Sequence, residues 1–230
     1  MDHMQWPQQA VESAAGWRFF RICEADSCRV FGTDRATLDA CMASQAQTLK
    51  HDRTTTVCRY QGPGGALILK RYNPRSFWHK IKRAFRRSRA RRCWQMSYAF
   101  AASGLRVARP LMMLEHRFGP IRRTAYFVSE SVDGDEVLHC LPNLTATQQV
   151  AVAEAVREAF ARMRAARITH GDMKASNLIW TGSELVFIDL DAAQTHWTTW
   201  GWRRKHAKDR RRFLKNWQDQ PDLLALFDNI

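Results

Sequence analysis

The sequence predicts an α+β fold with two lobes, an N-terminal lobe built on an antiparallel sheet with one helix, and a small, mostly helical C-terminal lobe. Residues 54–60 and 66–72 are rich in β-branched and aliphatic side chains and flank a Gly-Pro-Gly-Gly turn, which predicts paired strands. Residues 143–166 have the apolar spacing of a long helix. The 230 residues are enough for two lobes.

The first lobe is expected over residues 1–129, a connecting hinge over 130–134 and the second lobe over 135–230. In the first lobe, an aromatic hairpin is expected at 17–22 and 28–31, and a helical or irregular stretch at 37–50. A helix is expected over about 76–103. Paired strands at 111–114 and 124–128 follow, joined around Glu115–Gly119.

In the second lobe, the helix over 143–166 is expected to begin at a cap, Thr145 or Thr147. Its predicted buried stripe is Val150, Ala153, Val156, Phe160 and Met163. A hairpin over 178–188 follows, and a final helix is expected from Lys205 to Trp217.

The formal net charge of +14 is concentrated in two segments. Residues 71–92 hold ten Lys or Arg and no acid, and residues 203–212 hold seven with one acid, Asp209. Such patches favour anionic partners. Around Trp78, Ile81 and Phe85 the basic pattern fits either a helix at an anionic membrane surface or a solvated helix packed on its lobe. Trp197, Trp200 and Trp202 leave the same two alternatives open.

Other features of the composition narrow the class of protein. The N-terminus lacks the basic start and apolar run of a signal peptide, and no apolar stretch is long enough to span a bilayer. We therefore expect a cytoplasmic protein. The six cysteines show no C-x-x-C spacing, which favours reduced thiols over a zinc site or a disulfide framework.

Residues 168–177, Ile-Thr-His-Gly-Asp-Met-Lys-Ala-Ser-Asn, carry the chemistry. Asp172 follows His170 by two residues, and Asn177 follows Asp172 by five. The strand after the hairpin then ends at Asp189, within the segment 189–191. Phosphoryl transfer from ATP needs such a set: one carboxylate for the acceptor hydroxyl, with an amide and a second carboxylate for Mg²⁺. This spacing is the catalytic-loop signature of the protein-kinase-like fold.

With Lys70 near a strand end, the hinge, the catalytic loop and Asp189 in order, the chain resembles the lipopolysaccharide kinase family, bacterial enzymes that phosphorylate Kdo or heptose sugars of the inner core. The likeness extends from about Thr54 to Trp217. It implies an ATP- and Mg²⁺-dependent kinase acting on a core glycolipid at the inner face of the cytoplasmic membrane. The protein would then be cytoplasmic or peripheral on that anionic surface, with no nucleic-acid partner.

The resemblance also implies a role for each matching residue. Lys70 would contact the α- and β-phosphates, and Asp172 would orient the acceptor hydroxyl or take its proton. Lys174 would steady the γ-phosphate charge, and His170 would support the loop. The remaining sites are Asn177 and Asp189 as Mg²⁺ ligands, with Glu130 and Val132 presenting backbone atoms to adenine.

Three departures from the kinase pattern keep alternatives open. No acidic residue lies between Arg71 and Arg109 to pair with Lys70, so Gln95, Asp189 or ATP itself would have to serve. No G-x-G-x-x-G precedes residue 54, and Asp189-Leu190-Asp191 stands in place of Asp-Phe-Gly. A membrane-associated pseudokinase or scaffold is therefore an alternative. A protein kinase is another, although 39 residues after Asp191 leave little room for a peptide-binding lobe.

Overall fold

The computed structural model describes residues 10–14, 17–21, 35–44, 46–62, 64–73, 88–118 and 121–230. The described chain divides into two compact units. The sheet unit holds the described residues up to Trp94 together with Arg109–Ser131, and the helical unit holds Gln95–Ala108 and Val132–Ile230. Residues 95–108, expected in the first lobe, therefore belong to the helical unit.

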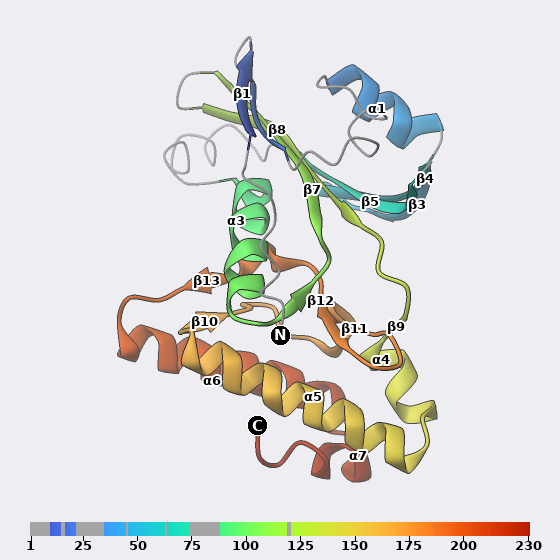
Figure 1. Ribbon diagram of the computed structural model, residues 1–230, viewed down its shortest axis with the longest axis vertical. Helices are drawn as coiled ribbons and strands as arrows, with labels where there is room; N and C mark the ends of the chain where they lie inside the picture. Colours follow the sequence, from blue (N-terminus) through green and yellow to red (C-terminus); the bar gives the residue numbers. More distant parts are fainter. Residues whose placement is uncertain are drawn as a thin grey trace. The chain divides into compact units, whose positions relative to one another are not determined.

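A seven-stranded sheet, in the order β1-β2-β7-β8-β5-β4-β3, forms the sheet unit, and every neighbouring pair is antiparallel (Figure 1). Its strands are β1 Ala10–Ala14, β2 Trp17–Arg21, β3 Ala46–His51, β4 Thr55–Gly62, β5 Gly65–Tyr72, β7 Pro110–Phe118 and β8 Ile121–Glu130. Residues 28–31, half of the expected hairpin, lie outside the described residues.

Helix α1 (Arg35–Ser44) packs on one face of this sheet. Because side chains alternate along a strand, one face collects the apolar residues. This core comprises Leu38, Cys41 and Met42 of α1 with Cys58, Leu67, Leu69, Leu111, Met112, Leu114, Tyr126 and Val128 of the sheet. Asp39 of α1 ties the helix to the sheet, since it accepts a hydrogen bond from the Tyr126 hydroxyl at 2.6 Å and pairs with Arg71 at 3.1 Å.

Two strand predictions need correction. The stretch 37–50 was expected to be helical or irregular. Residues 37–44 are helical, as part of α1, whereas residues 46–50 belong to the edge strand β3, whose residues alternate poorly and gave no strand pattern. The expected loop Glu115–Gly119 is mostly strand, because β7 continues to Phe118 and pairs there with Ile121. A buried glutamate within a strand is unusual, and Glu115 is accommodated by a short hydrogen bond from the Ser88 hydroxyl.

Helix α3 (Arg89–Ala102) begins at Arg89, where one helix over about 76–103 was expected. The Ser88 hydroxyl accepts the Arg91 N–H at 3.0 Å, as an N-terminal cap does. Residues 74–87, with Trp78, Ile81 and Phe85, lie outside the described residues.

The helical unit contains two small sheets and two long helices. Its further elements are β6 Arg106–Val107, β9 Asp135–Glu136, α4 Val137–Cys140, η1 Leu141–Asn143, α5 Ala146–Ala165, β10 Ile168–Thr169, η2 Ala175–Asn177, β11 Leu178–Trp180, β12 Leu185–Phe187, η3 Leu190–Ala192, β13 Gln194–Thr195, α6 Thr199–Leu214, η4 Lys215–Trp217 and α7 Pro221–Ala225. One sheet has the order β6-β12-β11-β9, and β10 pairs with β13 in the other.

Helix α5 starts at Thr145, one of the two expected caps, through a capping box with Gln148. Its buried residues are Val152, Ala153, Val156, Ala159, Phe160 and Met163. The inclusion of Val150 in the buried stripe is wrong, because its side chain is 44% exposed. Burial begins only at Val152, since the first turn and a half of α5 has no buried residue.

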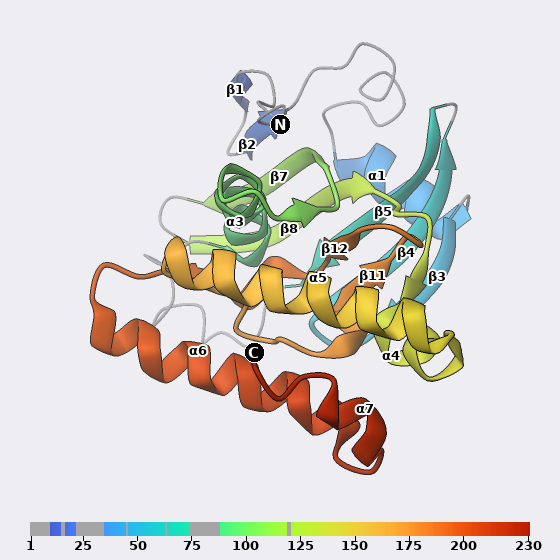
Figure 2. The same cartoon turned by 60° about the horizontal axis from the view of Figure 1, so that its bottom comes forward.

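Helix α6 runs beside α5 in both views (Figures 1 and 2), and Phe160 of α5 contacts His206 and Phe213 of α6 edge to face. It begins at Thr199, six residues before the expected start. The tryptophans differ in their environment: Trp217 is fully buried, whereas Trp197 and Trp200 are 95% and 77% exposed.

The segment before β7 is bound into the helical unit. Strand β6 pairs in parallel with β12, and Phe100 of α3 packs edge to face on Phe187 of β12. This arrangement positions β12, which ends just before Asp189. In the described part of the chain no helix is long and apolar enough to span a membrane. The four cysteines that the structure describes, Cys41, Cys58, Cys93 and Cys140, are free thiols.

Candidate active site

His170 is the buried centre of the loop that joins β10 to η2. Its Nε2 lies 3.1 Å from the Ile188 carbonyl, and its Nδ1 lies 3.4 Å from the Asp172 N–H. Burial lowers the pKa of His170, against a smaller opposing effect of the Asp209 carboxylate. A neutral ring with its proton on Nε2 satisfies both contacts, because it donates to Ile188 and accepts from Asp172. His170 thus fixes the backbone on either side of the loop.

Asp209 of α6 holds the same loop from the other side. Its carboxylate accepts the His170 N–H at 2.7 Å and the Gly171 N–H at 3.0 and 3.1 Å. The side chain is 1% exposed. Burial raises the pKa of Asp209, while these amide hydrogen bonds and His170 act in the opposite direction. The sequence did not suggest this role; the one available signal was a lone acid within a run of seven cations.

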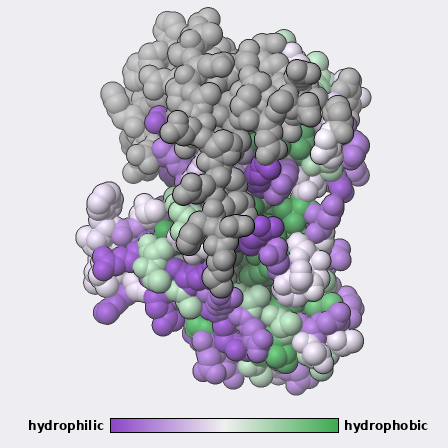
Figure 3. Space-filling model, viewed as in Figure 1, coloured by the Kyte–Doolittle hydropathy of each residue, from purple (hydrophilic) through white to green (hydrophobic). Residues whose placement is uncertain are grey.

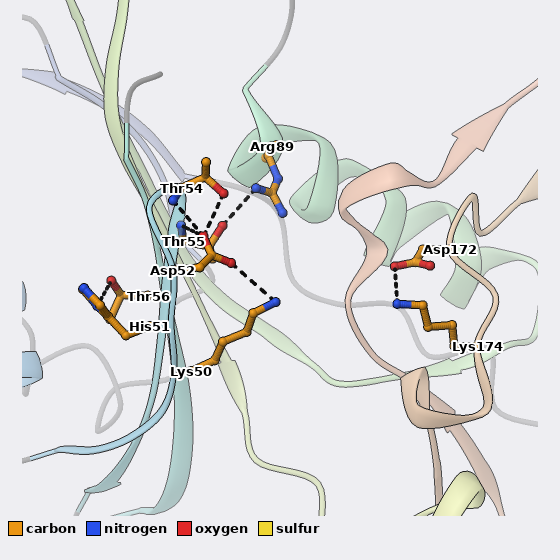
Figure 4. Close-up of polar contacts among 9 residues, drawn as sticks. All are labelled: Lys50, His51, Asp52, Thr54, Thr55, Thr56, Arg89, Asp172 and Lys174. Atoms are coloured by element: carbon orange, nitrogen blue, oxygen red, sulfur yellow. Dashed lines mark hydrogen bonds and ion pairs between the residues drawn. The ribbon is translucent and has the colours of Figure 1, made fainter. Parts of the chain in front are cut away.

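The carboxylate of Asp172 lies between two cations. Arg212 Nη2 is 2.7 Å from its Oδ1. Lys174 Nζ is 3.7 Å from its Oδ2, and Figure 4 shows this second pair. All three side chains are partly exposed. The two cations partly neutralise this carboxylate and would attract an anion brought beside it. Sequence reasoning found Lys174 and missed Arg212.

Asn177 links the catalytic loop to Asp189. Its Nδ2 donates to the Asp172 carbonyl at 2.8 Å, and its own carbonyl accepts the Ile188 N–H at 3.0 Å. Asp189 then has left-handed backbone angles, φ 59° and ψ 54°, which are costly for a residue with a side chain. Strained conformations of this kind gather at functional sites, so the outlier supports a role for Asp189.

The donor atoms here suit Mg²⁺. Because the Asn177 Nδ2 is bonded to Asp172, its Oδ1 is the amide atom available to a metal, and Asp189 adds carboxylate oxygens. Among the described residues, no cluster of three or more His, Cys, Asp or Glu could hold a metal ion by itself. One amide oxygen and one carboxylate are a donor set that suits a magnesium ion shared with nucleotide phosphates.

Gly171→Ala is expected to destabilise the protein by about 2 kcal/mol or more. Gly171 has φ +80°, and a Cβ there would overlap the Ala192 carbonyl. Gly182→Ala is the matched control, since Gly182 has φ +97° with open space around it and would suffer only the backbone strain. Chemical denaturation of both variants measures the difference. Equal losses in both would contradict a steric role for Ala192.

In the sheet unit, Lys70 lies on the face opposite the α1 core. Lys70 of β5 lies opposite Phe127 of β8, and Phe127 lies opposite Met113 of β7, so these three side chains point to the same face of the sheet. Because every second residue of a strand shares a face, Tyr72 of β5 and Glu115 of β7 also lie on it. Glu115 is 1% exposed. Sequence reasoning sought an acid on the following helix and therefore overlooked this carboxylate on β7.

The end of β8 carries the expected hinge residues. Glu130 donates its N–H to the Arg109 carbonyl at 3.0 Å, and its Oε1 accepts the Arg109 N–H at 2.9 Å. The Ser131 N–H donates to Ala66 at 2.8 Å. The N–H of Glu130 is therefore already used in a hydrogen bond within the sheet unit. Val132 begins the following run of the helical unit.

The turn between β3 and β4 stands where kinases have a glycine-rich loop. Asp52 Oδ1 accepts the N–H groups of Thr54 and Thr55 at 2.7 and 2.8 Å and the Thr54 hydroxyl at 2.9 Å (Figure 4). These bonds, chiefly those from Thr54, hold the pKa of Asp52 well below its usual range. An aspartate-centred turn thus forms the hairpin without glycine.

Acidification below about pH 6.5 is expected to destabilise the helical unit. Burial lowers the pKa of His170, His196 and His206, with Lys205 adding to the effect at His196. These rings are neutral in the fold, whereas the unfolded chain binds protons near pH 6.5, so stability is full above that pH and lost below it. Melting temperatures at pH 7.5 and 6.0 test this. His206→Gln should weaken the dependence, and a melting temperature that rises on acidification would contradict it.

Comparisons with known proteins identify the family and the fold of the chain. The family model described as lipopolysaccharide kinase (Kdo/WaaP) family matches residues 39–226. A solved structure, WaaP in complex with acyl carrier protein, is similar with a TM-score of 0.61 and 19% sequence identity, covering 92% of this chain and 96% of that chain. This likeness confirms the predicted α+β, protein-kinase-like fold. No curated protein sequence matches the chain.

Proposed function

Because the chain belongs to the lipopolysaccharide kinase (Kdo/WaaP) family, we propose that it transfers the γ-phosphoryl group of ATP to a heptose or Kdo hydroxyl of the lipopolysaccharide inner core. Family membership supports a phosphotransferase acting on lipopolysaccharide. The observation that carries the finer proposal is the chain of contacts from Asp172 through Asn177 to the residue before Asp189.

In the proposed reaction, Asp172 orients the acceptor hydroxyl and takes its proton as the oxygen attacks the γ-phosphorus. The bond from that phosphorus to the β,γ-bridging oxygen breaks, and ADP leaves. Lys174 and Arg212 stabilise the negative charge on the transferring group. Asn177 and Asp189 would hold Mg²⁺, and the ion would supply positive charge that neutralises the phosphates. His170 and Asp209 do not touch substrate and act by fixing the loop.

Lys70 is proposed to contact the α- and β-phosphates, as the resemblance implies. Its expected acidic partner is absent from the sequence of the following helix. Glu115 is a buried carboxylate on the same face of the sheet as Lys70. Its position supports the proposal that Glu115 takes the place of the acidic partner missing from the following helix. The Glu130 carbonyl and the Val132 backbone are proposed to meet adenine.

The experiment is ATP consumption by purified protein with inner-core glycolipid, followed by mass spectrometry of the glycolipid. One added phosphate per core supports the proposal, and cells lacking the protein should lack that phosphate. Mg²⁺-ATP binding with no transfer would instead favour a pseudokinase. Phosphate on added protein substrates but not on glycolipid would favour a protein kinase.

Peripheral attachment to the anionic inner face of the cytoplasmic membrane is part of the proposal. Trp197 and Trp200 are exposed just before and within the start of α6, followed by exposed Arg203 and Arg204. On the face shown in Figure 3, hydrophilic side chains predominate around α5 and α6. Tryptophan beside cations suits a membrane interface. The attachment is supported if the Trp197→Ala/Trp200→Ala variant no longer binds anionic vesicles. It is also supported if the native protein does not bind vesicles of neutral lipid.

A further inference from the structure

A hollow of about 590 Å³ lies beside the catalytic loop within the helical unit. Its lining residues are Lys174, Lys208, Arg211, Arg212, Lys215 and Asn216. Four of them, at 208, 211, 212 and 215, are spaced three, four and seven residues apart on α6 and η4, so they share one face. Five of the six carry a positive charge, and none of the described lining residues is acidic.

Such a concentration of charge is unfavourable for the helix by itself. Like charges three and four residues apart repel, by about 0.2–0.5 kcal/mol per pair. The negative end of the helix dipole, at the C-terminus of α6, offsets part of this repulsion. Arg212 is also paired with Asp172. Lys208, Arg211 and Lys215 are exposed, and a bound anion would relieve the repulsion among them.

The hollow is joined to the chemistry through Lys174 and Arg212, since both side chains line it and both contact Asp172. The magnesium-binding candidates Asn177 and Asp189 are not among its lining residues. An anion in the hollow would therefore lie next to the carboxylate that receives the acceptor hydroxyl. Asn216 donates to the Arg212 and Phe213 carbonyls at 3.0 and 2.6 Å, which fixes the end of α6 at this point.

We propose that this hollow binds an anionic group of the acceptor sugar, a phosphate or a carboxylate, adjacent to the hydroxyl that is phosphorylated. The proposal rests on the proposed function and names the chemistry of its acceptor. Several Lys and Arg donors around one anion give charge-assisted hydrogen bonds, and the arginine forks match either oxyanion. A neutral sugar would leave the cations of Lys208, Arg211 and Lys215 without a counter-charge.

The kinetic test compares Lys208→Gln/Lys215→Gln with Arg164→Gln/Arg167→Gln. The control removes the same charge from exposed residues at and just after the end of α5, which do not line the hollow. The first variant should raise the KM for acceptor glycolipid about tenfold or more, with the KM for ATP and kcat little changed. The control should change neither. An unchanged KM for the acceptor would overturn the proposal. An equal rise in the KM for ATP would also overturn it, because the hollow would then bind the phosphates of the nucleotide.

Acceptor treated with phosphatase separates the two oxyanions. If its KM rises in the native protein but not further in the Lys208→Gln/Lys215→Gln variant, the hollow holds a phosphate. If native and variant still differ tenfold, it holds a carboxylate. Absence of any transfer by the native protein would reject the proposed function and leave the hollow to be judged by binding alone.

That binding is measured by thermal unfolding with inorganic phosphate. Phosphate should raise the melting temperature of the native protein and of the Arg164→Gln/Arg167→Gln control. In the absence of phosphate, the Lys208→Gln/Lys215→Gln variant should have a higher melting temperature than the native protein, because repulsion among the cations is reduced. Added phosphate should raise the melting temperature of this variant much less than that of the native protein. Equal rises in all three proteins would mean that phosphate acts elsewhere and would contradict the site.

Discussion

Asp172→Asn is expected to lower turnover by about 10²–10⁴-fold, the range that a positioned general base contributes. Asparagine keeps the shape of the side chain and cannot take the proton of the acceptor hydroxyl. The Asn177 bond goes to the backbone carbonyl of residue 172 and should survive the change. Product formation from ATP and core glycolipid at saturating substrate measures the loss, since the defect should lie in kcat.

Two controls accompany this variant. Its melting temperature should stay close to that of the native protein, because Asp172 is partly exposed and its loss removes an ion pair that solvent already screens. Binding of Mg²⁺-ATP should also persist. Full turnover in Asp172→Asn would remove Asp172 from the proposed mechanism.

Asp209→Ala is expected to destabilise the protein by about 2–5 kcal/mol. It leaves the buried N–H group of His170 and the partly buried N–H group of Gly171 without their acceptor, and each orphaned buried donor costs about 1–3 kcal/mol. Burial disfavours the aspartate charge, as its raised pKa indicates, so part of this loss is offset. The amide contacts outweigh that gain because three of them converge on one carboxylate. Urea denaturation measures the change.

Asp209→Asn tests whether the effect comes from these hydrogen bonds. Asparagine retains one carbonyl acceptor, so it should recover part of the stability that alanine loses. Activity should follow the same order at a temperature where all variants are folded, since the loop carrying Asp172 depends on the anchor. Alanine and asparagine variants that unfold alike, or an alanine variant of native stability, would contradict the anchoring role.

The sequence was most informative where chemistry forces residue types into short spacings. The loop 168–177 and Asp189 were predicted from such spacing, and the structure joins Asp172 to Asn177 by a hydrogen bond. The strands at 54–60 and 66–72 were predicted because their apolar, β-branched residues form one core face. The chain has no glycine-rich motif before β4, and the turn there is built around Asp52 instead. It also has no Asp-Phe-Gly motif, and Asp189, with its left-handed backbone, begins the segment 189–191 that stands in its place.

What the sequence could not supply depends on long-range packing. Asp209 is surrounded in sequence by cations, so it resembled a solvated surface residue, and only the helix position turns it towards the loop backbone. Glu115 was assigned to a loop because a charge rarely lies within a strand, and its Ser88 partner is 27 positions away. Val150 fits the periodicity of α5, but the core against that helix begins only at Val152.

The parallel pairing of β6 with β12 means that the helical unit is not one continuous length of chain. Phe100 packs against both His170 and Phe187, and Ala108 donates to the Phe187 carbonyl at 3.1 Å. A fragment starting at Val132 would lack these contacts and expose the aromatic rings around His170. During synthesis, residues 95–108 must therefore wait until β12 has been made before these partners exist. Separate expression of the two halves would lose the same contacts.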